Sequence, residues 1–110
     1  MSDQPTHHDL LASLVENANY GAAHGVTVRR LSIRLNCTER HVRQLVTQLR
    51  EEGVAICGTP VDGYFIAANA HELNQTCAFL RSRAMRSLTL ESRLRKCSLS
   101  ELIGQLRLPT

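Results

Sequence analysis

Three short segments in the first half of the chain have apolar residues at helical spacing, and each predicts an amphipathic helix. The predicted helices span residues 7–17, 28–35 and 39–52, and a threonine directly precedes each one at the N-cap position. The apolar stripes consist of Leu10, Leu11, Leu14, Val15 and Ala18, then Val28, Leu31 and Leu35, then Val42, Leu45, Val46 and Leu49.

The second and third predicted helices are joined by a tight corner. Asn36 occupies the position where the chain must turn, and asparagine tolerates the left-handed backbone conformation better than other residues except glycine. Thr38 is the expected N-cap of the third helix, and Gly53 is expected to end that helix as its C′ glycine.

A short β-hairpin is predicted after the third helix. The apolar residues 54–56 form the first strand, the glycine- and proline-containing residues 58–63 form the turn, and residues 64–67 form the return strand. The glycine- and alanine-rich segment 20–25, which precedes the second helix, is predicted to be a loop.

The last third of the chain predicts two further helices. Asn69 followed by Glu72 indicates a capping box that opens a long helix, and Ser98 followed by Glu101 indicates one that opens a short last helix. The apolar stripe of the long helix drifts after Leu88, which a bend near residue 89 or a second partner surface explains equally well. The predicted fold is therefore mainly α with a small β-hairpin, divided into a domain of residues 1–68 and a C-terminal helical extension of residues 69–110.

Composition and charge change this picture in one respect. The chain has 110 residues and a formal net charge of +3, which suits one small domain with an appendage and permits nucleic-acid binding without requiring it. Between residues 27 and 50 there are six arginines and one glutamate, so the positive charge is concentrated on the second and third helices. A guanidinium group can bind phosphate or guanine through two parallel hydrogen bonds.

The exposed side of the third helix follows from its buried side. At 100° per residue, the side opposite the apolar stripe contains arginine, amide and hydroxyl groups. These residues are Arg40, Gln44, Thr47 and Glu51, flanked by His41, Arg43 and Gln48.

Residues 27–67 resemble a winged helix-turn-helix of the biotin-repressor and DeoR type. With the first helix included, the resemblance covers about half of the chain. Its most specific part is the run Leu-Arg-Glu-Glu-Gly, which is followed ten residues later by Gly-Tyr-Phe-Ile. The layout of such a domain with a helical tail is also similar to small prophage-encoded regulators. The residues that support the resemblance are Leu31, Leu35, Asn36, Thr38, Val42, Leu49, Arg50–Gly53 and Gly63–Ile66.

The resemblance implies that the third helix lies in the major groove of DNA. By position, the base-reading residues are then Arg40, Arg43, Gln44 and Thr47, and the residues expected to bind phosphate are Arg29, Arg30, Arg34 and Thr38. His41 is a further phosphate candidate, with covering of the core edge as its alternative. The hairpin corresponds to the wing, but it departs from the family pattern because residues 57–63 include Asp62 and no basic side chain. Thr59 and backbone amides are the only wing contacts that we expect.

These patterns favour a sequence-specific DNA-binding protein, most simply a bacterial or phage transcriptional regulator of the cytoplasm. The alternative is a protein-binding winged-helix module that acts as an inhibitor or adaptor of a host protein complex. We expect no enzymatic activity, because the chain contains no glycine-rich phosphate loop, no His-Glu-x-x-His motif and no nucleophile with a positioned base.

No cofactor, metal site, small-molecule ligand or membrane segment is expected either. The cysteines (Cys37, Cys57, Cys77 and Cys97) lack zinc-site spacing and are interpreted as reduced, small apolar side chains.

The C-terminal extension is expected to form a symmetric homodimer. DNA-binding modules of this size gain specificity when two copies bind a palindromic site. The last helix has four apolar residues on one side without an obvious partner in the chain: Leu99, Leu102, Ile103 and Leu106. The alternative is that the last two helices fold back on the first helix and complete a monomeric core.

Overall fold

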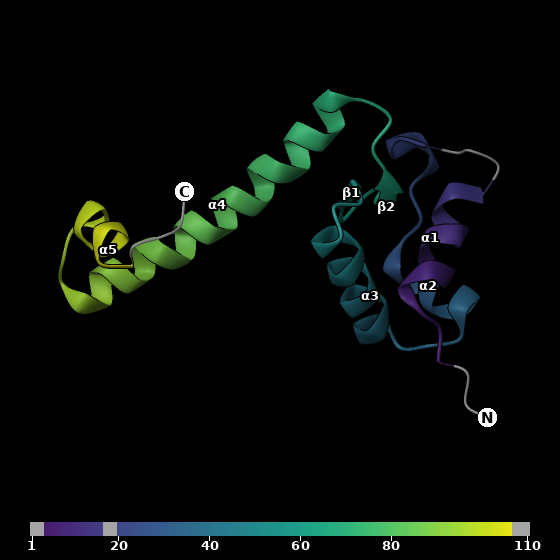
Figure 1. The fold of residues 1–110 in the computed structure, drawn as a ribbon, viewed down its shortest axis with the longest axis horizontal. Coiled ribbons are helices and arrows are strands. Elements are labelled where there is room, and N and C mark those ends of the chain that lie inside the picture. The colour runs from purple at the N-terminus through teal and green to yellow at the C-terminus, as the bar shows by residue number, and fades with distance from the viewer. Residues whose placement is uncertain (1–3, 17–19, 107–110) are drawn as a thin grey trace. The chain divides into compact units, whose positions relative to one another are not determined.

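The computed structural model describes residues 4–16 and 20–106 of the chain, which form two compact units, Met1–Thr76 and Cys77–Thr110. The described residues are mainly helical with one two-stranded antiparallel sheet, as predicted (Figure 1). The elements are α1 (His7–Val15), a 3-10 turn (Ala22–His24), α2 (Val28–Leu35), α3 (Glu39–Glu51), β1 (Ile56–Thr59), β2 (Gly63–Ile66), α4 (Ala70–Arg95) and α5 (Leu99–Leu106).

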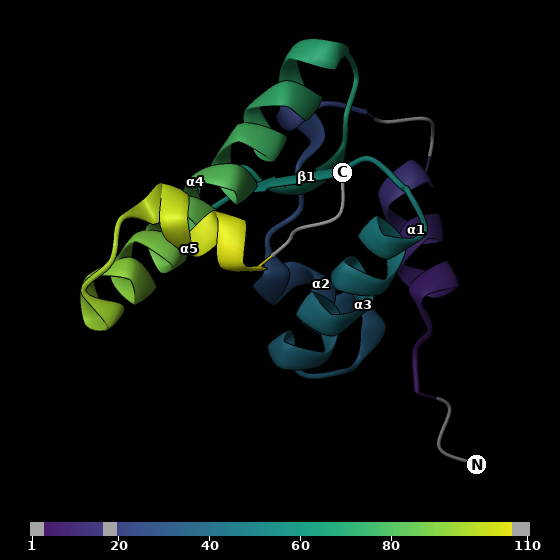
Figure 2. The same cartoon turned by 60° about the vertical axis from the view of Figure 1, so that its left-hand side comes forward.

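The core of the first unit lies between α1, α2 and α3, which pack against one another (Figure 2). Its buried side chains come from the predicted stripes, and Leu10, Leu31 and Val42 are fully buried. The capping box of Thr6 and Asp9 opens α1 as expected. This helix ends at Val15, and residue 17, where its end was predicted, lies outside the described residues.

The corner between α2 and α3 has the geometry that the sequence predicts. Asn36 adopts the left-handed conformation at φ 55° and ψ 52°. The Cys37 amide donates to the Ser32 carbonyl at 3.0 Å, and the Thr38 hydroxyl accepts from the His41 amide at 3.0 Å. α2 therefore ends and α3 begins within three residues, and both helix ends are fixed by hydrogen bonds. This leaves little freedom in the angle between α2 and α3.

A Schellman motif ends α3 and explains why the hairpin begins later than predicted. Gly53 has a φ of +87°, and its amide donates to the Arg50 carbonyl at 3.0 Å. The Val54 amide donates to the Leu49 carbonyl at 3.0 Å, so residue 54 still belongs to the helix end. The expected strand at 54–56 is therefore wrong at both ends, because β1 runs from Ile56 to Thr59. The expected turn at 58–63 is too long, because β2 already begins at Gly63 and ends at Ile66.

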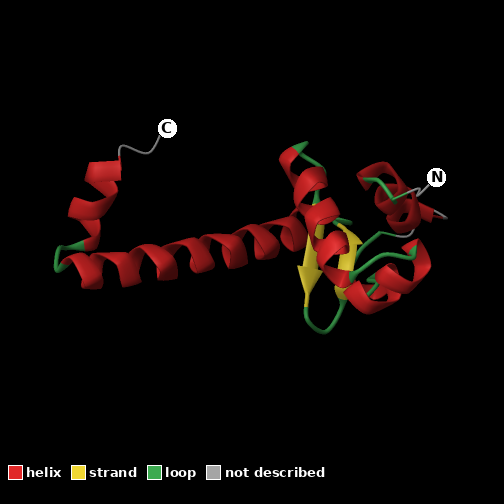
Figure 3. Ribbon diagram, turned by 90° about the horizontal axis from the view of Figure 1, so that it is seen from below, coloured by secondary structure: helices red, strands yellow, loops and turns green. Residues whose placement is uncertain are grey.

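The hairpin pairs Ile56 with Ile66 and Thr59 with Gly63 in antiparallel register (Figure 3). The segment before α2 also pairs with β2, which the prediction of a plain loop missed. Val26 and Tyr64 exchange two backbone hydrogen bonds of 2.8 Å, and the Gly21 amide donates to the Ile66 carbonyl at 2.8 Å. The hairpin is thus attached to the entry of α2 by backbone hydrogen bonds.

The first turn of α4 belongs to the first unit. Asn69 caps the helix by accepting from the Glu72 amide at 2.9 Å, but Glu72 does not complete the expected capping box. Its carboxylate accepts from the amides of Ala68 and Ala22, each at 2.9 Å. The first turn of α4 is thus attached to residue 22, and the first unit ends at Thr76, later than the expected boundary at 68.

Stability should depend on pH through Glu72. The two amide donors hold the pKa of this carboxyl below its ordinary value of 4.5, so folding favours the charged form. The resulting stabilisation is present above the ordinary pKa and is lost as the pH falls through the lowered pKa of the folded state. We expect Glu72→Gln to lower the melting temperature at pH 7, with a smaller difference from the wild type at pH 3, in thermal denaturation followed by circular dichroism. Glu51→Gln is the control variant, because it removes an exposed carboxyl group of α3 that makes no hydrogen bond to the described residues.

The second unit contains a corner with the same hydrogen bonds as the corner between α2 and α3. Lys96 has a φ of 55°, and the Cys97 amide donates to the Ser92 carbonyl at 2.9 Å. The Ser98 hydroxyl accepts from the Glu101 amide at 3.1 Å, and the buried Ser92 hydroxyl donates to the Thr89 carbonyl at 2.7 Å. The corresponding bond in the first corner runs from Ser32 to Arg29, also at 2.7 Å. Residues 92–98 therefore repeat the local structure of residues 32–38, although the two segments share only part of their residue identities.

The long helix α4 continues without interruption through residue 89 to Arg95. This continuity excludes a break in the helix near residue 89, whereas a bend and a second partner surface both stay as explanations for the drift of its apolar stripe. Large apolar side chains are exposed along it, including Phe79 at 59%, Leu90 at 56% and Leu94 at 84%.

Candidate nucleic-acid interface

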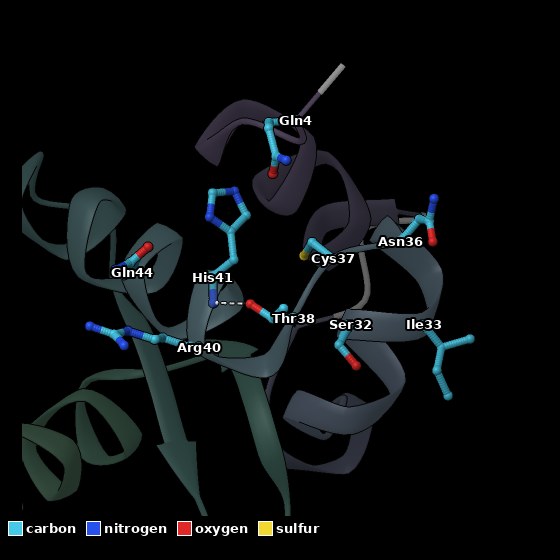
Figure 4. A pocket seen from close by; sticks show the side chains of 9 residues that line it. All are labelled: Gln4, Ser32, Ile33, Asn36, Cys37, Thr38, Arg40, His41 and Gln44. Atoms are coloured by element: carbon cyan, nitrogen blue, oxygen red, sulfur yellow. Dashed lines mark hydrogen bonds between the residues drawn. The ribbon is translucent and has the colours of Figure 1, made fainter. Parts of the chain in front are cut away.

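The exposed side of α3 contains the residues that were expected there. Arg40, Arg43, Gln44 and Thr47 are all exposed, and the opposite side of the helix is buried in the core. Figure 4 shows Arg40 and Gln44 projecting to the same side of α3. The spacing of the apolar stripe was therefore sufficient to predict which side chains α3 presents to its surroundings.

Two of the four base-reading candidates have partners within α3. A guanidinium nitrogen of Arg43 lies 3.6 Å from a carboxylate oxygen of Glu39, and the Thr47 hydroxyl donates to the Arg43 carbonyl at 3.1 Å. Arg40 and Gln44 have no side-chain hydrogen bond to any residue that the structure describes. These two side chains are thus the ones most readily available to an external ligand.

A hollow of about 790 Å³ lies at the beginning of α3. It is lined by the corner and by both helices that meet there, so the available groups include amide, hydroxyl and guanidinium donors. The free amides at the start of α3 also favour a negatively charged ligand such as phosphate. The lining residues are Gln4, Ser32, Ile33, Asn36, Cys37, Thr38, Arg40, His41 and Gln44 (Figure 4).

His41 points away from Arg40 and towards the N-terminal segment (Figure 4). Its Nε2 atom lies 3.1 Å from the carbonyl oxygen of Pro5, and the side chain is half-buried. This contact favours the second of its two sequence-based interpretations, in which His41 covers the edge of the core. Thr38 is the N-cap of α3, as predicted, because its hydroxyl accepts from the His41 amide.

The three arginines of α2 are exposed, but two of them lie beside a different hollow. Arg30 and Arg34 line a cavity of about 240 Å³ together with Ser13, Glu16 and His24. The Arg34 guanidinium donates to the Ser13 hydroxyl at 3.0 Å. On the side of the α3 hollow, α2 instead presents Ile33, which is 71% exposed and was not among the predicted site residues.

The tip of the hairpin offers an apolar surface and no basic group. The Thr59 hydroxyl accepts from the Asp62 amide at 2.8 Å and donates to the Asp62 carboxylate at 3.1 Å, so the turn itself occupies this hydroxyl. Val61 at the tip is 87% exposed. Thr59, the wing contact expected from the sequence, is therefore engaged within the turn.

The four apolar residues of α5 differ in their exposure. Leu106 is 43% exposed, and Leu99 and Ile103 are half-buried. Leu102 is 1% exposed, so the expectation that it lacks a partner within the chain is wrong. It belongs to the interior of the fold, and only the other three can contribute directly to an interface.

The cysteines are free thiols with different surroundings. Burial raises the pKa of the Cys37 thiol, and Cys57 is fully buried. Cys77 is exposed, so the interpretation of all four cysteines as buried apolar groups is wrong for this residue. Among the described residues, no group of three or more His, Cys, Asp or Glu side chains is arranged to hold a metal ion.

Comparison with known proteins finds no match to a protein-family model, to a curated protein or to a solved structure. Within the described residues, no helix has both the length and the apolar composition needed to cross a bilayer.

Proposed function

We propose that the first unit is a winged helix-turn-helix and that the chain is a sequence-specific DNA-binding protein, most simply a transcriptional regulator. The observation that supports this proposal is the arrangement at the start of α3. Arg40 and Gln44 are exposed on one side of a helix that the corner at Asn36 and the core hold in place. An α-helix fits the major groove, where base edges present distinct patterns of donors and acceptors.

The side chains of α3 suit particular base edges. Arg40 can donate two hydrogen bonds to guanine O6 and N7, and Gln44 can exchange two with adenine N6 and N7. Arg43 can bind guanine in the same way once it leaves Glu39, and Thr47 can contact a base edge or a thymine methyl group. The amides at the start of α3, with Arg29 of α2, would bind phosphate and fix the register of the helix on the duplex.

Selection of bound sites from a random duplex library tests this function directly. A recovered consensus sequence supports base reading, and an inverted repeat also indicates a symmetric homodimer. Recovery of sequences without a consensus would contradict it. Sedimentation of the free protein at micromolar concentration tests the proposed dimer independently, with the exposed apolar residues of α5 as its candidate contacts.

Arg40→Ala should relax the base preference at one position of the selected site. Loss of one bidentate contact is expected to reduce discrimination at that base pair by about 1–3 kcal/mol, or roughly 5- to 150-fold. Arg29→Ala is the matched control, because loss of a phosphate contact should weaken binding to all sequences by a similar factor. Competition binding with single-base variants of the site measures both effects. Unchanged discrimination in Arg40→Ala would show that this residue does not read bases.

A second candidate function is favoured by the apolar side chains around the same surface. Ile33 and Val61 are 71% and 87% exposed, and neither suits contact with phosphate. In this alternative, the first unit binds another protein and acts as an inhibitor or adaptor. Capture of one defined partner that survives nuclease treatment and high salt, together with loss of that capture in Ile33→Asp, would favour it over DNA binding.

A further inference from the structure

The two units of the chain have opposite net charges. The first unit contains six basic and eight acidic residues, for a net charge of −2, although α2 and α3 are locally basic. The second unit contains seven basic and two acidic residues, for a net charge of +5. Attraction to a polyanion is therefore stronger for the second unit, where the function proposed above assigns no contact to DNA.

The basic side chains of the second unit are also more available than those of the first. Arg81, Arg83, Arg86, Arg93, Arg95 and Lys96 are all exposed. Among the described residues, only Arg95 has an acidic partner, Glu91, at 2.7 Å. In the first unit, by contrast, half of the arginines already have partners in the protein itself. Arg34 donates to the Ser13 hydroxyl, Arg50 donates to the Ile56 carbonyl, and Arg43 forms an ion pair with Glu39.

Three of these arginines lie on one side of α4. Arg83, Arg86 and Arg93 are spaced at i, i+3 and i+10, which keeps them within one face of a helix with 3.6 residues per turn. The span from residue 83 to 93 is about 15 Å at 1.5 Å per residue, or roughly four base-pair steps at 3.4 Å. The apolar residues Leu80, Ala84 and Leu88 fall on the other side of the helix, whereas the exposed Phe79, Leu90 and Leu94 fall on the same side as the three arginines. We call the face with these three arginines the arginine face.

The α5 helix shows what kind of contact the second unit can make. Because residues 92–98 repeat the corner at 32–38, α5 corresponds in position to α3. The residues that correspond to Arg40, Arg43 and Gln44 are Ser100, Ile103 and Gly104. These side chains lack the paired donors and acceptors that distinguish bases. Any contact of the second unit with DNA is therefore expected to be independent of sequence.

We infer that the arginine face of α4 binds the phosphate backbone of duplex DNA and supplies much of the sequence-independent, salt-sensitive affinity of the chain. This inference rests on the DNA-binding function proposed above, since it assigns base reading to α3 and charge neutralisation to α4. Duplex DNA fits better than a lipid surface because apolar and charged residues are mixed on both sides of α4. Arg81 and Glu91 lie beside or within the side that contains Leu80, and Phe79 and Leu90 lie within the arginine face. A helix that lies on a bilayer needs one apolar side that is continuous and uncharged.

The dependence of DNA affinity on salt tests this inference in a chain that contains both units. Each phosphate contact contributes roughly 0.9 to the slope of log affinity against log salt concentration, so Arg83→Gln/Arg86→Gln should reduce the slope by about 1.8. The matched control is Arg81→Gln/Lys96→Gln, which removes the same charge from two exposed residues outside the arginine face and should change the slope much less. Glutamine and arginine have similar helix propensities, and circular dichroism verifies that α4 is retained in both variants.

Two duplexes separate this inference from the proposed function: one with the selected site and one of random sequence. We expect the Arg83/Arg86 variant to lose affinity for both by a similar factor, with their ratio unchanged. Equal slopes in the test and control variants would overturn the arginine face but leave base reading by α3 intact. Salt-sensitive binding of the wild type without preference for either duplex would overturn base reading and leave the arginine face intact. Binding of vesicles with 30 mol% phosphatidylserine that requires Arg83 and Arg86, with the salt slope on DNA unchanged, would also overturn the inference.

Discussion

Gly63→Ala is expected to destabilise the first unit by about 2–5 kcal/mol, because two independent costs apply at this position. Gly63 begins β2 with a φ of +78°, a conformation that costs a residue with a Cβ atom about 1–2 kcal/mol. A Cβ atom here would also lie 2.4 Å from the backbone carbon and oxygen of Val26. Those atoms belong to the bridge between Val26 and Tyr64, so they cannot move without breaking its hydrogen bonds.

Gly53→Ala is the matched control, because it has only the first of these costs. Gly53 has a φ of +87°, and a Cβ atom there meets no other atom within 4 Å. We expect a loss of about 1–2 kcal/mol from backbone strain alone. Urea denaturation followed by circular dichroism measures both variants. Equal losses would mean that the bridge at Val26 yields easily and that the hairpin is only loosely attached to α2.

The features that the sequence predicted correctly are local. Helix starts depend on a capping side chain and an amide three residues away, as at Thr27, where the hydroxyl accepts from the Arg30 amide at 3.2 Å. The turn at Asn36 depends on the conformation of one residue. The orientation of α3 depends only on the spacing of its own apolar residues. In each case the physical cause lies within a few residues of its effect, so a single sequence is enough.

The features that the sequence missed depend on distant segments. The carboxylate of Glu72 accepts from the amide of Ala22, 50 residues away, in place of the local capping box. His41 contacts Pro5, and Arg34 contacts Ser13, so neither side chain projects as freely as its own helix suggests. Periodicity within one helix contains no information about which segment packs beside it.

The repeated corner in the second unit was missed for a different reason. Its key residues have the same roles as those of the first corner but only partly the same identities: Lys96 replaces Asn36, and Ser98 replaces Thr38. The two corners share backbone conformation and hydrogen bonds but not their exposed side chains. A comparison of amino-acid identities therefore does not reveal the repeat, whereas a comparison of hydrogen bonds does. This difference also divides the proposed roles, with base reading on α3 and phosphate binding on α4.

Leu31→Ala is expected to lower the free energy of unfolding of the first unit by about 2–5 kcal/mol. Leu31 is fully buried and belongs to the cluster that joins α1, α2 and α3, so truncation leaves a cavity beneath the corner. A unit of about 76 residues has a total stability of roughly 4–11 kcal/mol, so this single change removes a large fraction of it. The same change should shift the midpoint of urea denaturation to a much lower concentration without a new sequence preference in the folded fraction.

Ile33→Ala provides the control for this effect, because it shortens a side chain on the same helix that is 71% exposed. Its unfolding free energy should stay within about 0.5 kcal/mol of the wild type. The two variants together separate the roles of the two sides of α2: Leu31 packs in the core against α3, and Ile33 is exposed. A loss in Ile33→Ala as large as that in Leu31→Ala would mean that Ile33 is covered by another part of the chain in solution. The surface around the α3 hollow would then be unavailable to the major groove, and the base-reading role of Arg40 and Gln44 would fail with it.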